Sequence, residues 1–190
     1  MNITLLGNCQ TKALSWYIQQ LDPSFNVKWI CIEIFLPHWG PTSQFRGKPI
    51  NVITDTQKAI KTLQSSDHLI FQHIRSSENY NLEKIKMHAK NAKLISISSF
   101  FYDPDIEDPK ASGLMGMIAR ANRFNIDIPA HKMIEKHGHK IEIVRNNDAP
   151  THPGVFYFLE LVREICEKTG WDYYSDEQYN QYLKQGYPFG

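Results

Sequence analysis

The first hundred residues alternate between short apolar segments and segments with helical periodicity, and this alternation constrains the fold more than any other feature. The apolar segments are rich in β-prone side chains and span residues 2–6, 25–36, 51–54, 67–74 and 93–101. Helical spacing of apolar residues lies between them, over residues 11–21, 55–63 and 81–92. Strands that alternate with helices predict a mainly parallel sheet with helices on both faces. We therefore predict an α/β fold with three layers, of the SGNH or flavodoxin-like kind.

The second half of the sequence continues with helices and one further strand. Residues 114–136 predict two helices with a break near Pro129, and residues 140–144 predict a last strand. Pro153 is expected in the first turn of an amphipathic helix that ends at Gly170.

The remaining residues form an aromatic and polar tail from about residue 171. The tail is expected to pack over the domain, to join a partner or to fray. Because no repeat or linker interrupts the pattern, residues 1–190 are predicted to form a single domain.

Composition narrows the class of partner. The chain carries 21 basic and 20 acidic side chains, a balance that argues against a nucleic-acid or membrane-surface binder. No run approaches the roughly 18 apolar residues of a membrane span, so no integral membrane segment is predicted. We expect a cytoplasmic protein, with peripheral contact to a membrane-bound polysaccharide assembly system and a homodimer both left open.

The cysteines and histidines do not predict a metal site. Cys9, Cys31 and Cys166 are odd in number and widely spaced, which predicts neither a disulfide framework nor a thiolate zinc site. The histidines also lack the paired spacing of metal ligands.

Polar residues follow four of the predicted strands at the point where each strand ends. They occupy residues 7–10 (GNCQ), 72–75 (QHIR), 101–105 (FYDPD) and 146–153 (NNDAPTHP). In open α/β sheets, ligands bind at the carboxyl ends of the strands, near the topological switch point. These four segments are therefore expected to converge on one site.

Cys9 is the first candidate for chemistry because it lies where a helix begins. The helix dipole and free backbone amides at such a position lower a thiol's pKa and stabilise an anion. Gly7 permits a tight turn, and Asn8 and Gln10 supply amide donors for a developing oxyanion. The structural alternative is that Cys9 is a small buried apolar residue and Asn8 a helix cap.

His152 is the second candidate, since a histidine near a thiol is the usual general base. Asp148 lies four residues earlier and is a candidate to orient the imidazole, although both residues also suit turn formation and capping. Further polar candidates for substrate contact are Gln72, Asp103 and Asp105, with a solvated loop as the alternative for the two aspartates. The basic candidates for phosphate contact are Lys12, Arg75, Arg120 and Arg123.

The sequence resembles the WcbI-type capsular polysaccharide biosynthesis proteins, which are regarded as acetyltransferases that bind coenzyme A. The resemblance rests on LLGNCQTKAL, FQHIR, SISSFFYDPD and NNDAPTHPGVFYFLELV, in that order along the chain. It implies acetyl-CoA as co-substrate and a sugar or polysaccharide precursor as acceptor.

The layout also resembles SGNH-type hydrolases and acyltransferases, in which a nucleophile follows the first strand and an Asp-x-x-His motif precedes the last helix. Cys9 stands where their serine would, and Asp148 to His152 is one residue longer than that motif. Asp103 or Asp105 is the alternative partner of the histidine.

Three functions follow as hypotheses. The first is O-acetyl transfer from acetyl-CoA to a sugar hydroxyl, either through a Cys9 thioester or by direct attack with Cys9 lining the oxyanion site. The second is an SGNH-like esterase or thiol hydrolase acting on glycans. The third is a non-catalytic module that binds coenzyme A or a glycan.

Overall fold

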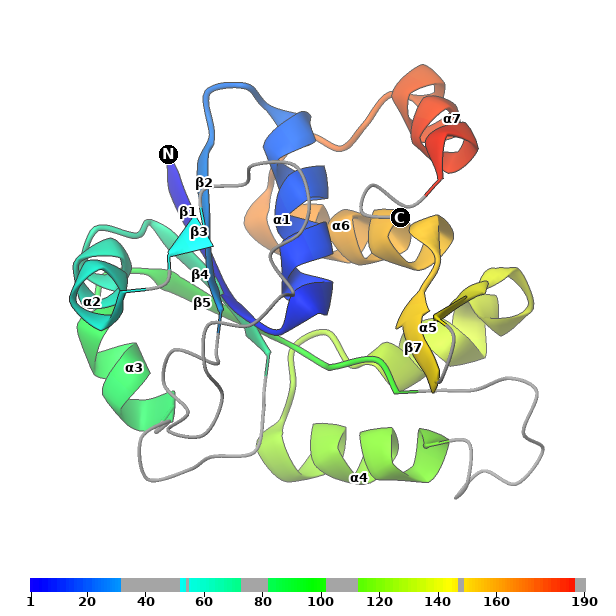
Figure 1. Cartoon of the computed structure of the whole chain (residues 1–190), viewed down its shortest axis with the longest axis horizontal. Coiled ribbons are helices and arrows are strands. Elements are labelled where there is room, and N and C mark those ends of the chain that lie inside the picture. The colour runs from blue at the N-terminus through cyan, green and yellow to red at the C-terminus, as the bar shows by residue number, and fades with distance from the viewer. Residues whose placement is uncertain (32–51, 54, 73–81, 102–112, 147–148, 187–190) are drawn as a thin grey trace. The chain divides into compact units, whose positions relative to one another are not determined.

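The computed structural model describes residues 1–31, 52–53, 55–72, 82–101, 113–146 and 149–186 (Figure 1). The chain divides into two compact units, residues 1–96 and residues 97–188. The single domain over residues 1–190 stays a prediction.

The first unit contains a five-stranded sheet whose order is β3-β2-β1-β4-β5. The strands are β1 Asn2–Gly7, β2 Asn26–Cys31, β3 Val52–Ile53, β4 His68–Gln72 and β5 Lys93–Ile97. β1 pairs in parallel with both β2 and β4, and β2 pairs in parallel with β3. The predicted α/β class with a mainly parallel sheet is thus confirmed, and each strand falls within or beside its predicted segment.

Helices lie on both faces of this sheet (Figure 1). They are α1 Cys9–Leu21, α2 Thr56–Gln64 and α3 Leu82–His88. On one face, four strand residues pack with residues from α2 and from the α3 region, namely Leu6, Ile30, Leu69, Phe71, Ala59, Leu63, Ile85 and Ala89. α1 covers the opposite face, where Trp29 donates its indole N–H to Thr11 Oγ1 at 3.0 Å. Because side chains alternate along a strand, Trp29 and Ile30 necessarily face opposite layers.

The order of the strands places a topological switch point between β1 and β4. The chain leaves β1 toward β2 on one side and later returns to β4 on the other side. Loops at the carboxyl ends of two such strands diverge and leave a crevice, which is where α/β proteins bind ligands. Gly7 ends β1 and Gln72 ends β4, so both residues border this position.

The second unit contains four α-helices among its described residues and a two-stranded antiparallel sheet. The helices are α4 Leu114–Phe124, α5 Ala130–His137, α6 Val155–Thr169 and α7 Asp176–Gln185, with a short 3-10 helix at Gly138–Lys140. The break near Pro129 and the end of α6 at Gly170 are confirmed. Gly170 adopts φ +78°, the left-handed conformation that ends helices readily at glycine.

The strand predicted over residues 140–144 begins three residues later, as β6 Ile143–Asn146. It pairs antiparallel with β7 Ala149–Pro153, a strand that was not predicted. Pro153 therefore ends a strand, whereas the sequence places it in the first turn of α6. The helix begins two residues later because Gly154 donates its N–H to the Glu142 carbonyl at 2.6 Å and so stays in the hairpin geometry.

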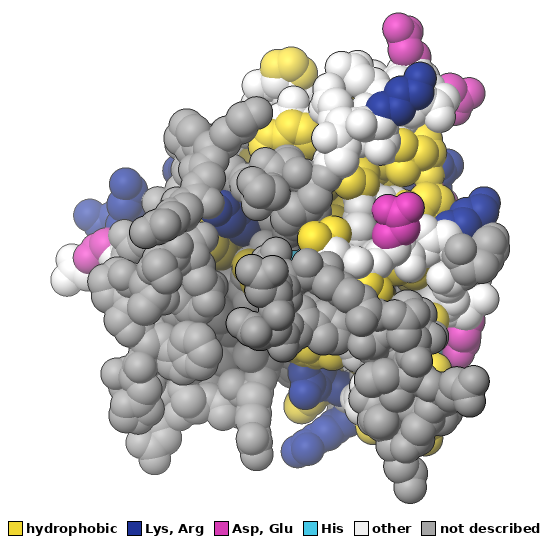
Figure 2. Space-filling view, turned by 45° about the vertical axis from the view of Figure 1, so that its right-hand side comes forward, with side chains coloured by type: hydrophobic (Ala, Val, Ile, Leu, Met, Phe, Trp, Pro, Cys, Tyr) yellow, Lys and Arg dark blue, Asp and Glu magenta, His cyan; other side chains and the backbone are white. Residues whose placement is uncertain are grey.

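The surface carries charges of both signs. On the described part of the face in Figure 2, basic and acidic side chains are interspersed with hydrophobic ones, and neither sign forms a large patch. None of the helices in the described ranges is long and apolar enough to cross a membrane.

Candidate active site at the switch point

The turn from β1 into α1 is held by Asn8, which caps the helix. Its side-chain Oδ1 accepts the Gln10 backbone N–H at 2.9 Å, and its carbonyl accepts the Thr11 hydroxyl at 2.7 Å. Such a cap satisfies one of the backbone donors at the start of a helix and fixes where the helix begins. Cys9 is consequently the first residue of α1, two residues earlier than the predicted start.

Gln72 joins the end of β4 to this turn. Its Oε1 accepts the Asn8 backbone N–H at 2.9 Å, and its Nε2 donates to Gln10 Oε1 at 3.3 Å. The side chain is only 1% exposed, so both contacts lie in a protected environment. Gly7, Asn8, Gln10 and Gln72, all predicted for this site, are thus brought together around the beginning of α1.

Gly7 leaves room for this arrangement. A Cβ built on Gly7 would collide with Gln72 Oε1 and would stand 2.6 Å from Thr11 Cγ2. The absence of a side chain at this position is therefore what lets Gln72 reach Asn8.

We expect Gly7→Ala to destabilise the protein and to loosen the Gln72 contact. Over-packing a close-fitted site costs about 1–3 kcal/mol, because neighbours must shift to admit the added methyl. Urea unfolding measures this loss, and Gly116→Ala is the matched control. Gly116 lies inside α4 with open space around its Cβ position, so alanine there is expected to stabilise by up to about 1 kcal/mol. Equal stability of Gly7→Ala and the wild type would contradict the packing argument.

Cys9 differs in its surroundings from the other two cysteines. All three are reduced thiols; Cys9 is half-buried, whereas Cys31 and Cys166 are buried. Burial raises the pKa of Cys166 to about 12, which keeps that thiol protonated and inert. Cys9 is therefore the cysteine with the access that a nucleophile requires.

Lys12 lies one helical turn after Cys9 and is only 5% exposed. Its Nζ is 6.0 Å from the centroid of the Trp29 ring. Burial lowers the pKa of Lys12, and the charge of Cys9 opposes that shift by favouring the ammonium.

His152 lies in β7, where it pairs with Val144, and not in a loop before a helix as predicted. It is half-buried, and burial lowers its pKa. Because His152 belongs to the second unit and Cys9 to the first, their pairing stays a prediction.

The other predicted site residues are distributed as follows. Arg120 and Arg123 are exposed on α4, in the second unit. Arg75, Asp103, Asp105 and Asp148 lie outside the described residues, so their roles stay predictions.

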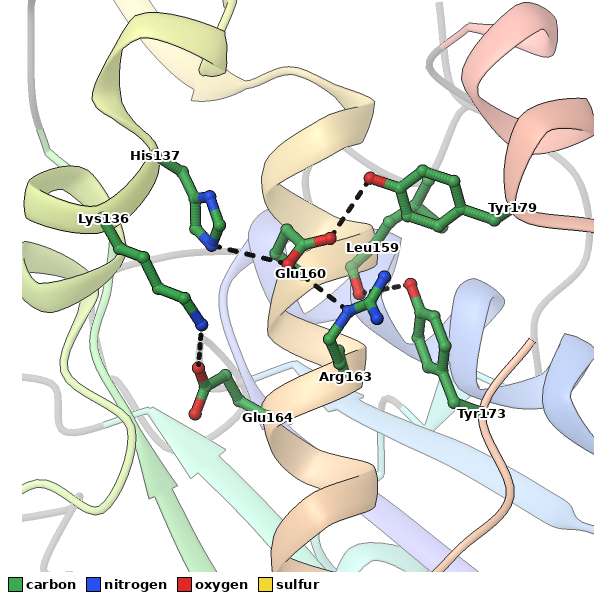
Figure 3. A network of polar contacts seen from close by, with 8 residues as sticks. All are labelled: Lys136, His137, Leu159, Glu160, Arg163, Glu164, Tyr173 and Tyr179. Atoms are coloured by element: carbon green, nitrogen blue, oxygen red, sulfur yellow. Dashed lines mark hydrogen bonds and ion pairs between the residues drawn. The ribbon is translucent and has the colours of Figure 1, made fainter. Parts of the chain in front are cut away.

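A polar cluster in the second unit was not predicted (Figure 3). Glu160 on α6 contacts three side chains: His137 Nε2 at 3.5 Å, Arg163 Nε at 3.4 Å and the Tyr179 hydroxyl at 3.1 Å. Arg163 also lies over the Tyr173 ring, with 4.5 Å from its guanidinium carbon to the centroid. The cluster joins α5, α6 and α7, and the sequence signal for it is a carboxylate inside the apolar run FYFLELV.

We expect the protein to lose stability in mild acid because three of its histidines are hard to protonate in the folded state. The pKa values of His68, His137 and His152 are lowered from 6.5, in each case chiefly by burial. Below pH 6.5 the unfolded chain therefore binds more protons than the folded one, and the free energy of unfolding falls as pH falls. Urea unfolding between pH 7.5 and 5 measures this slope, and His152→Gln is expected to flatten it. A free energy of unfolding that rises as pH falls through this range would contradict the assignment.

Among the residues that the structure describes, no group of three or more His, Cys, Asp or Glu side chains is arranged to hold a metal ion. No protein-family model matches the chain, and no curated protein matches it.

Proposed function

We propose that the chain is an acyltransferase in which Cys9 takes an acyl group as a thioester and passes it to a hydroxyl. The observation that carries this proposal is the position of Cys9, half-buried at the start of α1, beside the sheet's switch point and one turn from a buried lysine. A thiol that is accessible, begins a helix and lies one helical turn from a cation is the kind of cysteine that acts as a nucleophile.

The neighbouring amides suit the charge that develops during acyl transfer. Attack on a thioester carbonyl moves negative charge onto its oxygen, and preorganised donors stabilise that oxyanion. The helix cap uses Asn8 Oδ1, which leaves the Asn8 side-chain N–H groups as donors at the same turn. Gln72 fixes this turn through the Asn8 backbone, so the donors are held before substrate arrives.

We propose acetyl-CoA as the acyl donor and a sugar hydroxyl of a surface or capsular polysaccharide precursor as the acceptor. The support is the resemblance of GNCQ and the late Thr-His-Pro segment to the WcbI-type proteins, within an SGNH-like or flavodoxin-like three-layer layout. Lys12, Arg75, Arg120 and Arg123 are the proposed candidates for the phosphates of coenzyme A. This function implies that the protein acts in the cytoplasm, at the membrane-bound system that assembles the polysaccharide.

Calorimetry with coenzyme A, followed by an acetyl-transfer assay with a panel of sugars, tests the proposal. We expect saturable binding of coenzyme A and formation of an acetylated sugar. If the protein hydrolyses acetyl sugars and does not bind coenzyme A, the proposal is wrong and the protein is an esterase. If the protein binds coenzyme A but transfers acetyl groups to no acceptor, the proposal is wrong and the protein is a non-catalytic binding module.

His152, oriented by Asp148, is the proposed base that activates the acceptor hydroxyl. Loss of one general base typically lowers the rate by about 10²–10⁴-fold, so His152→Ala is expected to lower kcat by that factor. Single-turnover kinetics should place the loss in transfer to the sugar and not in loading of Cys9. Full activity of His152→Ala would contradict the role of His152 as the base.

A further inference from the structure

The helices α2 and α3 carry an excess of lysine that the rest of the chain does not share. Residues 56–64 and 82–90 contain five lysines and one acidic residue, Glu83, so these two segments have a net charge of +4. The whole chain has a net charge of +1, so all other residues together carry −3. The balanced composition of the chain therefore hides a local concentration of positive charge.

The two helices present their lysines on one surface. α2 and α3 contact each other and lie side by side on the same face of the sheet, against the apolar cluster described above (Figure 1). Because the apolar sides of both helices face the sheet, their outer sides face solvent together. Lys58 and Lys61 on α2, Met87 on α3 and Lys90 just after α3 are all exposed. These four residues are called the α2–α3 surface below.

The lysines of the α2–α3 surface carry unpaired charges. Within the described ranges, no carboxylate forms an ion pair with Lys58, Lys61 or Lys90. Glu83, the acidic residue of these helices, is paired with Lys86 at 3.2 Å. Three lysines are therefore left to attract an external anion.

Two aspartates flank the helices, and backbone amides hold both of them. Asp55 caps α2 by accepting the Lys58 backbone N–H at 2.7 Å, and Asp67 accepts the Asn2 backbone N–H at 2.7 Å. Neither carboxylate forms an ion pair with a lysine of the α2–α3 surface. The acidic residues nearest in sequence thus serve the fold and do not neutralise this surface.

An exposed methionine lies among these lysines. Met87 is 73% exposed, the largest fraction among the large hydrophobic side chains in the described part of the chain. Ile85 and Ala89 take the side of α3 that packs on the sheet, so Met87 points away from the core. A flexible apolar side chain beside basic residues suits the boundary between water and lipid.

The residue types on these helices favour a lipid surface over a nucleic acid or a protein. Residues 56–64 and 82–90 contain no arginine, phenylalanine, tryptophan or tyrosine. Binding of nucleic acid commonly adds arginine forks and aromatic stacking, and protein interfaces are anchored by tryptophan, tyrosine and arginine. Lysine is a strongly hydrated point charge, and clusters of lysine bind anionic lipid headgroups.

We propose that the α2–α3 surface docks the protein on a membrane that contains anionic lipids. The lysines lie near the headgroup phosphates, and Met87 enters the interfacial layer. This inference rests on charge and exposure in the first unit and does not depend on the proposed acyl transfer.

The direction of the helices keeps the candidate site away from this membrane. Helices that connect parallel strands run opposite to them, so α2 and α3 end at the edge of the sheet where β4 and β5 begin. Lys61 lies in the last turn of α2, and Lys90 follows α3. Gly7 and Gln72 end their strands at the opposite edge, about 17 Å away along the five residues of β4. Docking through Lys61 and Lys90 therefore does not cover the turn that carries Cys9.

Co-sedimentation of the full chain with lipid vesicles tests the proposal. One set of vesicles contains phosphatidylcholine alone, and the other contains equal parts of phosphatidylcholine and phosphatidylglycerol. We expect binding to the anionic vesicles at about 0.1 M salt, and its loss at about 1 M salt, where the Debye length is shorter. Equal binding to both kinds of vesicle would overturn the proposal.

A matched pair of double variants tests the surface itself. A lysine near an anionic membrane is worth about a fivefold change in binding, so Lys58→Gln with Lys61→Gln is expected to weaken binding about 20-fold. Lys132→Gln with Lys184→Gln removes the same charge from exposed positions on α5 and α7 and should bind as the wild type does. Equal weakening by both pairs would overturn the assignment to α2 and α3. Circular dichroism and urea unfolding establish that the variants fold.

Met87 and an RNA probe complete the test. Met87→Gln is expected to weaken binding to the anionic vesicles about fivefold, whereas Met87→Leu keeps an apolar side chain and should bind as the wild type does. Equal binding of Met87→Gln and the wild type would overturn the insertion of Met87. Binding of the wild type to polyuridylic acid, without binding to anionic vesicles, would overturn the membrane as the partner. None of these measurements uses coenzyme A or a sugar, so their failure leaves the proposed function untouched.

Discussion

Replacing Cys9 with alanine is expected to abolish acyl transfer while leaving the protein folded. Removal of a covalent nucleophile lowers the rate by about 10³-fold or more, because the whole two-step route is lost. The expected structural cost is small, since Cys9 is half-buried and Asn8, not Cys9, provides the cap of α1. Initial rates with acetyl-CoA and urea unfolding of the same preparation test both statements.

Cys166→Ala is the matched control for this variant. Cys166 is buried, donates weakly to the Asp172 carbonyl at 3.8 Å and has its pKa raised to about 12. Its removal is expected to lower stability but to leave the rate per folded molecule unchanged. If Cys9→Ala retained the wild-type rate, the covalent route would be wrong, and Cys9 would at most line the oxyanion site.

Replacing Glu160 with glutamine is expected to have the largest effect on the stability of the second unit. The Glu160 side chain is 9% exposed and contacts His137, Arg163 and Tyr179. Glutamine keeps the shape but removes the charge that faces Arg163, and loss of a charged hydrogen-bond partner costs about 1–3 kcal/mol. Urea unfolding measures the loss of free energy.

The effect should be concentrated at α7. None of the residues of α7 is buried, and Tyr179 is the residue through which this helix contacts Glu160. Hydrogen exchange over residues 176–185 is therefore expected to accelerate in Glu160→Gln. Glu164→Gln is the control, because its 3.8 Å ion pair with Lys136 is largely exposed and is worth about 0–1 kcal/mol. Equal effects of the two substitutions would contradict the central role of Glu160.

Much of the first unit can be predicted from its sequence because local and tertiary signals agree there. The apolar run before Gly7 forms β1, and the helical spacing of Leu14, Ile18 and Leu21 corresponds to α1. Asp55 caps α2 by accepting the Lys58 backbone N–H at 2.7 Å, which matches the predicted helix start within one residue. Strands and helices of this kind are fixed by short-range periodicity.

The hairpin of β6 and β7 shows where this reasoning fails. Prolines at 150 and 153 argue against a strand, because proline cannot donate to a sheet ladder. A two-stranded sheet has only edge strands, however, and an edge strand tolerates proline on the side that makes no hydrogen bond. Asparagine and aspartate favour turns, so the sequence Asn147-Asp148 was the available signal.

The contacts at the switch point could be predicted only in part. The polar strand ends point to Gly7, Asn8, Gln10 and Gln72 as neighbours, but which atoms meet depends on the order of β1 and β4. The burial of Lys12 cannot be predicted from the sequence, since a lysine in the first turns of a helix is usually exposed. Its position beside Trp29 depends on how α1 packs on β2.

The mass of the intact protein after brief treatment with acetyl-CoA tests the central claim most directly. We predict an increase of one acetyl group on the wild type, mapped to Cys9, absent from Cys9→Ala and removed when an acceptor sugar is added. A wild-type protein that transfers acetyl groups at full rate without acquiring this adduct would contradict the thioester route.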